Sequence, residues 1–160
     1  MSIPEKEIEE KILDRFAEVA SSIGYSPLHG KIIGVLIVRG KPMSLQEVAK
    51  ATGYSSSMVS LSLDLLELLG IIKKVKKTAD RKLYIEFQGD LLSALKSAIL
   101  VRVEKAVNST LGEFEDTRKQ LDQLNGEEKA RVNRTLNTLE TEMKRLNKYV
   151  TLLSKLNFPK

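Results

Sequence analysis

The sequence predicts a mainly α-helical protein with one β-hairpin near its middle and two long antiparallel helices in its C-terminal part. Apolar residues recur every three or four positions over most of the 160 residues, which is the period of an amphipathic helix. Between residues 71 and 87 the pattern changes to short β-branched and aromatic runs. Beyond Gly89 the helical period returns, with one interruption at Asn125-Gly126.

Two helices are expected before the first strong break. Residues 4–22 carry one apolar row of Ile8, Ile12, Phe16, Val19 and Ile23. The row needs a partner. A second helix, residues 27–38, starts with Ser26-Pro27, which resembles an N-cap followed by proline at the first helical position, and Gly40-Lys41-Pro42 ends it.

Two shorter helices follow at a sharp turn. Ser44 and Glu47 have the spacing of a capping box, which begins a third helix that ends near Thr52. After the turn Gly53-Tyr54-Ser55, a serine caps a fourth helix that continues to Leu69. Its inward-facing row is Val59, Leu63 and Leu66.

A β-hairpin comes next, with strands at residues 72–76 and 83–87 and a turn at residues 78–81. Two helices joined by a sharp turn and followed at once by a basic hairpin have the order of a winged helix-turn-helix. We therefore expect a three-helix core plus β-hairpin wing.

The C-terminal helices have a coiled-coil pattern. The second one carries an unbroken alternation of three and four over Val132, Leu136, Leu139, Met143, Leu146, Val150 and Leu153. An antiparallel hairpin would bury one stripe of each helix, and the same hairpin or a second subunit would cover the first helix. We expect three parts: residues 1–24 as an N-terminal dimerisation helix, 25–89 as the winged helix-turn-helix, and 90–160 as a long-helix dimerisation domain.

More apolar surface is predicted on these helices than one such chain would leave exposed, so we expect a homodimer. The expected dimer interface consists of Ile8, Ile12, Phe16, Leu139, Met143, Leu146, Val150 and Leu153.

Several function classes lack the residues that they need. The chain has no cysteine and one histidine, which excludes thiolate zinc sites, a three-imidazole zinc site within one chain, and a cysteine nucleophile. His29 sits in an expected first helical turn with no nucleophile pattern beside it, so we interpret it as structural. No cofactor, metal or enzymatic role is expected. The apolar stretches are too short for a membrane span and the N-terminus has no signal peptide, so we expect a cytoplasmic protein that does not interact with membranes.

Positive charge is concentrated in the middle of the chain. Residues 31–86 hold ten Lys or Arg and five Asp or Glu, a net charge of +5 that equals the formal charge of the whole chain. The densest part is residues 73–82 of the expected hairpin, where six basic residues oppose only Asp80. Such a patch suits nucleic acid, although a lysine-rich hairpin that only aids solubility has the same composition.

The middle segment resembles MarR-type transcriptional regulators, and the GbsR branch is nearest. The resemblance rests on residues 43–49, 53–55, 58–63, 66–67 and 70–74, and on Arg81-Lys82-Leu83-Tyr84. It implies that the N-terminal helix and the two long helices form a dimer, and that a small-molecule effector, here unidentified, binds near them. One difference lies at the wing tip. MarR proteins typically carry Asp-x-Arg there, whereas Arg81 directly follows Asp80 in this chain.

These observations predict a homodimeric DNA-binding regulator of the MarR/GbsR type that binds double-stranded DNA through helix 55–69 and wing 71–87. The fourth helix has no Arg or Lys, so hydroxyl and apolar contacts would read bases while wing cations bind phosphates and the wing arginine enters a minor groove. The expected DNA-binding residues are Lys41, Lys50, Ser56, Ser57, Ser60, Leu61, Lys73, Lys74, Lys76, Lys77, Arg81 and Lys82. Two alternatives remain: an architectural protein that coats DNA with little sequence preference, and a winged-helix protein-interaction module.

Overall fold

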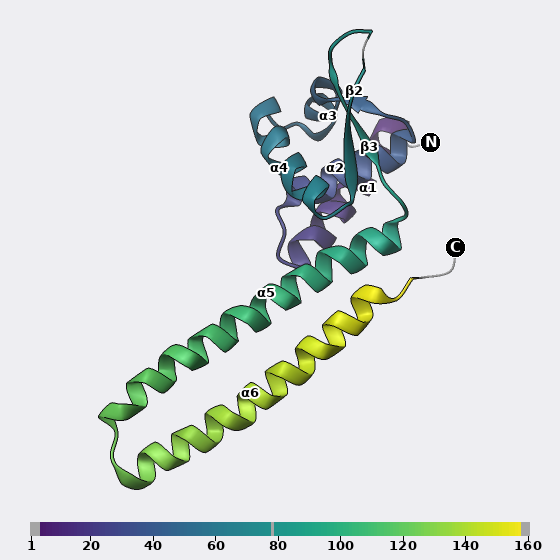
Figure 1. Cartoon of the computed structure of the whole chain (residues 1–160). Helices are drawn as coiled ribbons and strands as arrows, with labels where there is room; N and C mark the ends of the chain where they lie inside the picture. Colours follow the sequence, from purple (N-terminus) through teal and green to yellow (C-terminus); the bar gives the residue numbers. More distant parts are fainter. Residues whose placement is uncertain (1–3, 78, 158–160) are drawn as a thin grey trace. The chain divides into compact units, whose positions relative to one another are not determined.

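The computed structural model describes residues 4–77 and 79–157 and divides the chain into two compact units, residues 1–95 and 96–160. The first unit contains four helices and a small sheet, and the second is a pair of long helices (Figure 1). Within the described residues, no helix is long and apolar enough to cross a bilayer.

The first unit begins with two closely packed helices, α1 (Glu5–Ser22) and α2 (Pro27–Arg39). Gly30 and Gly34 allow the close approach: a Cβ at Gly30 would lie 2.1 Å from the carbonyl oxygen of Phe16, and one at Gly34 would lie 2.9 Å from Leu13. Ion pairs from Arg39 to Glu9 (2.9 Å) and from Lys31 to Asp14 (3.3 Å) flank the contact. α2 therefore covers one face of α1, a contact that the sequence analysis did not predict.

The apolar row predicted for α1 is not the face that packs on α2. The buried side chains are Leu13, Ala17 and Ala20, whereas Ile8, Ile12 and Val19 are exposed. Gly30 lies against the backbone of Phe16 and Ala17, and Gly34 lies against the side chains of Leu13 and Phe16, so the tight face of α1 is the one that meets these glycines. Phe16, expected at the dimer interface, is half-buried and its ring lies 3.2 Å from the position of a Cβ at Gly34.

The helix-turn-helix follows as α3 (Leu45–Thr52) and α4 (Ser56–Leu68). The predicted capping signals form. Ser44 Oγ accepts from the Glu47 amide at 3.3 Å, and Glu47 Oε2 accepts from the Ser44 amide at 2.7 Å. Ser55 Oγ accepts from the Met58 amide at 3.3 Å, which begins α4 at its expected residue.

The wing consists of β2 (Ile72–Lys76) and β3 (Leu83–Phe87), paired antiparallel with Lys74 opposite Ile85. A two-residue strand, β1 (Met43–Ser44), pairs with the other edge of β3 and gives the sheet order β1-β3-β2. Its two residues are too few for a periodicity, so the sequence did not predict it. Thr78, in the predicted turn, lies outside the described residues.

The core of the first unit joins its helices to the sheet. Its largest fully buried side chains come from α2, α3, α4 and the sheet region: Ile32, Leu36, Val48, Val59, Leu63, Leu66, Ile71 and Ile85. The inward row predicted for α4 is confirmed. The predicted fold, a winged helix-turn-helix with an N-terminal helix and a long C-terminal helical hairpin, is the observed one (Figure 1).

The second unit is an antiparallel hairpin of α5 (Leu91–Gln120, whose first turn belongs to the first unit) and α6 (Gly126–Lys155), joined by a short 3-10 helix, η1 (Leu121–Gln123). At one end Lys96 donates to the carbonyl oxygens of Ser154 (3.4 Å) and Leu156 (2.5 Å), which places a cation at the negative end of α6. Near the turn, Lys129 pairs with Asp122 at 2.8 Å.

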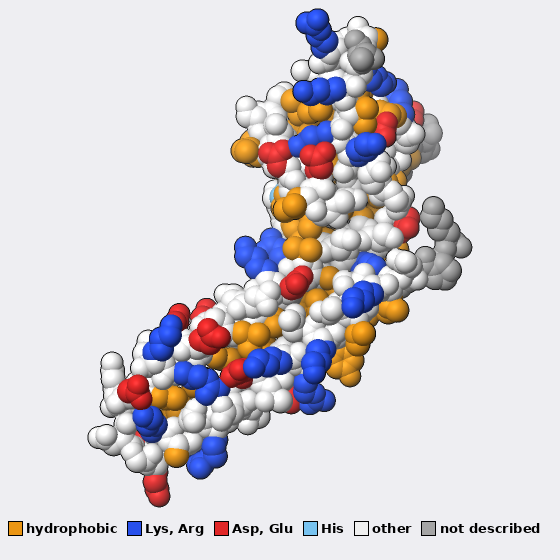
Figure 2. Space-filling model, in the orientation of Figure 1, with side chains coloured by type: hydrophobic (Ala, Val, Ile, Leu, Met, Phe, Trp, Pro, Cys, Tyr) orange, Lys and Arg blue, Asp and Glu red, His pale blue; other side chains and the backbone are white. Residues whose placement is uncertain are grey.

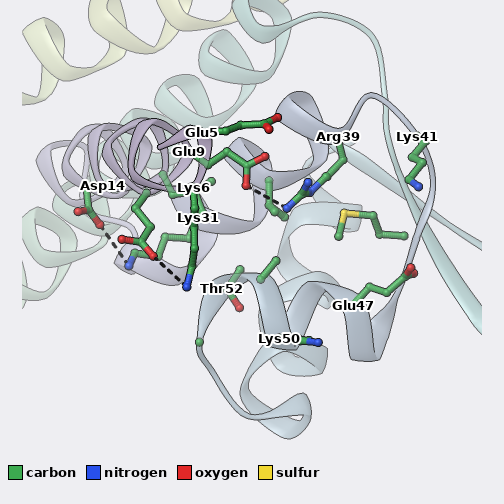
Figure 3. A pocket seen from close by; sticks show the side chains of 16 residues that line it. Glu5, Lys6, Glu9, Asp14, Lys31, Arg39, Lys41, Glu47, Lys50 and Thr52 are labelled. Atoms are coloured by element: carbon green, nitrogen blue, oxygen red, sulfur yellow. Dashed lines mark hydrogen bonds and ion pairs between the residues drawn. The ribbon is translucent and has the colours of Figure 1, made fainter. Parts of the chain in front are cut away.

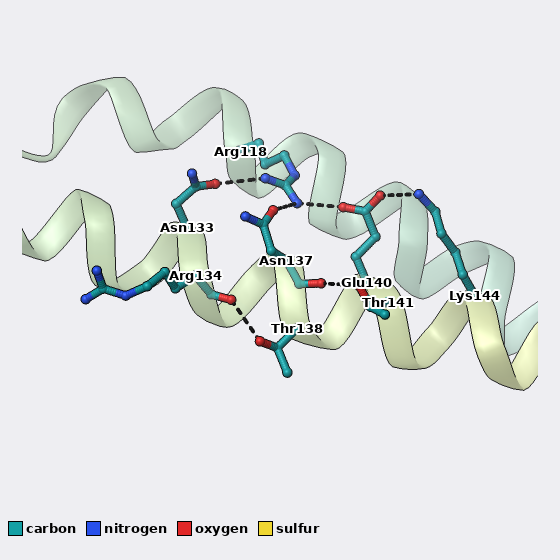
Figure 4. A network of polar contacts seen from close by, with 8 residues as sticks. All are labelled: Arg118, Asn133, Arg134, Asn137, Thr138, Glu140, Thr141 and Lys144. Carbon is teal, nitrogen blue, oxygen red and sulfur yellow. Dashed lines mark hydrogen bonds and ion pairs between the residues drawn. The ribbon is translucent and has the colours of Figure 1, made fainter.

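An arginine joins the two helices between these ends. Arg118 donates to Asn133 (2.8 Å), Asn137 (2.7 Å) and Glu140 (2.6 Å), and Lys144 pairs with the other oxygen of Glu140 (Figure 4). Lys144 and then Arg118 lower the pKa of the Glu140 carboxyl from its ordinary value.

The coiled-coil row predicted on α6 consists of a buried set and an exposed set of side chains. Leu136 and Val150 are buried and Met143 is half-buried, whereas Leu139, Leu146 and Leu153 are 42%, 40% and 46% exposed. Two of the expected interface residues, Met143 and Val150, therefore belong to the inside of the hairpin. Three leucines spaced seven residues apart remain as an exposed row.

Candidate nucleic-acid interface

The exposed face of α4 is uncharged over its first two turns. Ser56, Ser57, Ser60 and Leu61 are all exposed, as the sequence predicted, while Val59 between them is buried. Met58 is 50% exposed on the same stretch, which adds an apolar group that the sequence analysis did not select. Hydroxyls can bond base edges or phosphates, and apolar groups can contact the methyl of thymine.

The wing carries a dense group of exposed cations, and Lys and Arg side chains surround it in Figure 2. Lys73, Lys76, Lys77, Arg81 and Lys82 are exposed. Lys73 and Lys76 lie on β2, and the other three lie on the turn between β2 and β3, on a ribbon that projects from the core (Figure 1). A ribbon of this kind can follow the phosphate backbone.

The wing tip is fixed by an aspartate that the sequence analysis counted only as an opposing charge. Asp80 accepts from the Tyr84 hydroxyl at 2.7 Å and from the Lys82 amide at 3.1 Å. The hydrogen bond from Tyr84 is the main reason that the pKa of Asp80 lies below its ordinary value, and Asp80 in turn raises the pKa of Tyr84. Lys77 completes the group, because its Nζ lies 4.1 Å from the centre of the Tyr84 ring.

Arg81 is held at this tip in an unusual backbone conformation. Its φ of 56° is the single positive value among the described residues other than glycine. Its amide donates to the carbonyl oxygen of Lys77 at 3.1 Å, which closes the turn. The left-handed region is strained for arginine. The hydrogen bonds that Asp80 accepts from Lys82 and Tyr84, which follow Arg81 in the chain, help to hold the turn. The tip thus presents Arg81 as an exposed side chain.

Lys74 differs from the other basic residues of the wing. Its ammonium pairs with Asp64 and with Glu67, the latter at 3.1 Å, and its side chain is 20% exposed. Asp64, which would repel phosphates if unpaired, is neutralised in this way. Lys74 is therefore ion-paired in this structure, whereas Lys73, Lys76 and Lys77 are exposed.

Lys41 and Lys50 line a groove between α1, α2, β1 and α3 with a volume of about 940 Å³ (Figure 3). Both are exposed, and Glu47 lines the groove beside them. The Ser44 amide and hydroxyl hold the pKa of Glu47 below its ordinary value. Lys41 and Lys82 of the wing also lower this pKa, and the rim of the groove carries both acidic and basic residues.

The histidine has the structural role that we expected. Nδ1 of His29 accepts from the Ser26 amide at 3.1 Å, and Ser26 Oγ accepts from the Leu28 amide, so the imidazole forms part of the cap of α2. Within residues 4–77 and 79–157, no group of three or more His, Asp or Glu side chains could hold a metal ion.

Known proteins whose sequences are similar to this chain are helix-turn-helix transcriptional regulators. No protein-family model matches the chain. The chain is 26% identical to the HTH-type transcriptional repressor OpcR of Bacillus subtilis over 82% of its own length and 75% of that protein. It is 25% identical to the "Putative HTH-type transcriptional regulator YvaV" of the same organism, over 94% of its own length and 86% of that protein.

A solved structure shows the same fold. The crystal structure of a transcriptional regulator superposes with a TM-score of 0.67 at 18% identity, covering 92% of this chain and 97% of that one. The winged helix-turn-helix with its long helical hairpin is therefore a known arrangement. The chain is similar to helix-turn-helix transcriptional regulators along most of its length.

Proposed function

We propose that this chain is a homodimeric DNA-binding transcriptional regulator of the MarR type, nearest the GbsR branch. The observation that carries the proposal is that an uncharged, exposed face of α4 and a rigid cationic wing with Arg81 at its tip belong to one winged unit. The similarity to helix-turn-helix regulators over most of the chain supports it.

The division of roles follows from chemistry. Ser56, Ser57, Ser60 and Leu61 face the major groove and read bases through hydroxyl and methyl contacts. Lys73, Lys76, Lys77 and Lys82 bind phosphates, with Lys41 and Lys50 as more distant phosphate contacts. Arg81 enters a minor groove, where A·T-rich sequence enhances the negative potential.

Dimer formation is the second part of the proposal. The exposed row of Leu139, Leu146 and Leu153 supports it, together with Ile8 and Ile12 on α1. Exposed apolar side chains gather along the hairpin in Figure 2. A two-fold dimer would present two wings to half-sites about 10 bp apart. DNA binding places this function in the compartment that holds the DNA, in line with a cytoplasmic protein.

The experiment that tests the proposal is selection of genomic DNA fragments by the purified protein. We expect a small number of fragments that share a two-fold symmetric site, with an affinity that falls steeply as salt increases. Retention of no fragment at low salt would overturn the proposal and favour a protein-interaction module.

One observation favours a second candidate, an architectural protein. No Arg or Lys occurs in α4, so the strongest bidentate contact to guanine is absent from this helix. Equal retention of all fragments in the same selection would support this candidate over a regulator.

A further inference from the structure

Lys74 is bound to the recognition helix by three contacts. Its ammonium pairs with Asp64 and Glu67, and its backbone amide donates to Glu67 Oε1 at 3.2 Å. The two oxygens of Glu67 are thus shared between the backbone and the side chain of one residue of β2. Hydrogen bonding to Asp64 raises the pKa of Lys74, so the ammonium keeps its charge.

The two acidic partners come from the same face of α4. Positions 64 and 67 are three residues apart and therefore lie on neighbouring turns of one face. Asp64 is also one turn beyond Ser60, on the helix that we assign to the major groove. An unpaired carboxylate here would face the phosphates of bound DNA at close range and repel them.

We propose that Lys74 is a positioning residue, which ties the recognition helix to the wing and neutralises Asp64 and Glu67, and that it does not itself bind a phosphate. The proposal rests on the DNA-binding function proposed above. To reach a phosphate, the ammonium would leave two carboxylates, and α4 would then carry two uncompensated negative charges toward DNA. The sequence alone gives Lys74 the same role as its neighbours.

Lys76 supplies a matched control. It lies two residues further along the same strand, so its side chain points to the same face as that of Lys74. It is exposed and has no ion pair with another described residue. Lys76 is thus a free cation on the same ribbon.

The experiment measures DNA affinity against salt concentration for the full chain. The variants are Lys74→Met, Lys76→Met, and the pair Asp64→Asn with Glu67→Gln, alone and combined with Lys74→Met. The probes are a duplex recovered from the genomic selection and an unrelated duplex. All measurements are made well below the unfolding temperature of the weakest variant, so that a loss of stability alone does not change the affinity.

We expect Lys76→Met to lower the slope of log affinity against log salt by about 1, because one phosphate contact is lost. Lys74→Met should lower affinity about fivefold while changing the slope less. Adding Asp64→Asn and Glu67→Gln to Lys74→Met should restore most of that affinity, whereas the same pair in the parent protein should give no gain. Lys74→Arg should bind about as well as the parent.

Two results would overturn the inference while leaving DNA binding intact. One is a fall in salt slope for Lys74→Met as large as that for Lys76→Met. The other is the same gain from Asp64→Asn with Glu67→Gln in both backgrounds, since independent residues give additive changes. If the unaltered protein binds neither duplex, both the inference and the proposed function fail.

Discussion

The two units of the molecule treat their apolar residues differently. The unit of residues 1–95 contains every one of the largest fully buried side chains, from Ile32 to Ile85. The hairpin of residues 96–160 buries Val107, Leu136 and Val150 and leaves Leu139, Leu146 and Leu153 at least 40% exposed. Burial is the main source of folding free energy, so the first unit has a core of its own, while the hairpin leaves a second apolar row exposed.

This difference separates the expected effects of mutation. Changes in the leucine row of the hairpin should alter assembly, and changes in the wing or in α4 should alter DNA binding. A mutation that prevents assembly should lower DNA affinity only because a dimer binds two half-sites within one complex.

The largest effect is expected from Leu146→Lys in the leucine row. A charge in the centre of the row should prevent assembly, so that the mass by light scattering falls to that of a monomer. Affinity for a two-half-site duplex should then fall by about a hundredfold, because the second half-site no longer binds within the same complex. Thr138→Lys is the control, since Thr138 is exposed on α6 and its hydroxyl bonds only to the carbonyl oxygen of Arg134. A dimer of unchanged mass in Leu146→Lys would contradict the proposed interface.

The next prediction compares a glycine from each unit. Gly30→Ala should destabilise the first unit by about 3 kcal/mol, because the new Cβ would lie 2.1 Å from a backbone oxygen of α1 and the two helices would have to separate. Gly112→Ala in α5 should instead stabilise the hairpin by about 1 kcal/mol, since nothing lies within 4 Å and alanine favours the helix. Denaturant unfolding of both variants measures whether each substitution lowers or raises the free energy of unfolding. A stable Gly30→Ala would show that α1 does not need its close approach to α2.

A third prediction concerns the wing tip. Arg81→Ala should lower DNA affinity by about 1 to 3 kcal/mol, mostly for sites with A·T-rich flanks, and should leave the dimer mass unchanged. Tyr84→Phe removes only the hydroxyl that bonds Asp80, so it should give a smaller loss at the same flanks. Binding to a library of flank substitutions measures both. A loss that is independent of flank sequence would mean that Arg81 binds phosphates and does not enter the minor groove.

Sequence reasoning succeeded where the signal was local and failed where a tertiary partner decided the outcome. The caps at Ser44 and Ser55 involve residues three positions apart, so their spacing was sufficient to predict the starts of α3 and α4. The buried face of α1 depends on glycines in another helix. The helical period of α1 alone identified the row of large isoleucines and not the face that meets those glycines.

The candidate site also contains some features that local sequence predicts and others that depend on tertiary contacts. The exposed face of α4 followed from helical period alone, and the structure agrees. The role of Lys74 did not follow, because a run of lysines has the same composition whether or not one of them meets carboxylates from α4. The Asp80–Tyr84 bond joins the wing turn to the start of β3, and it depends on the conformation of the turn at Arg81, which residue composition does not reveal.

A smaller effect is expected from acid at Glu140 of the hairpin. The folded pKa of Glu140 is lowered by Lys144 and Arg118, so ionised Glu140 stabilises the fold above the ordinary value of 4.5. That stabilisation should be lost as the pH falls below 4.5 and through the lowered folded pKa. Glu140→Gln, which is neutral at every pH, should show a flatter dependence of unfolding free energy on pH in this range. Identical pH profiles for the two proteins would mean that the Arg118 contacts do not depend on the carboxylate.

The smallest effect is expected at Ser60, and it tests whether the first unit reads sequence at all. Ser60→Ala removes one exposed hydroxyl from α4 without opening the core, so stability and dimer mass should not change. Total affinity should fall by less than about 1 kcal/mol, but preference should change at one or two central base pairs, because a hydroxyl bond to a base edge is specific for that base. Ser57→Ala, on the same exposed face one turn earlier, should change preference at a neighbouring position. If both variants lose affinity equally for every duplex, the serine face contacts only phosphates, and specificity would have to come from the shape of the DNA read by the wing.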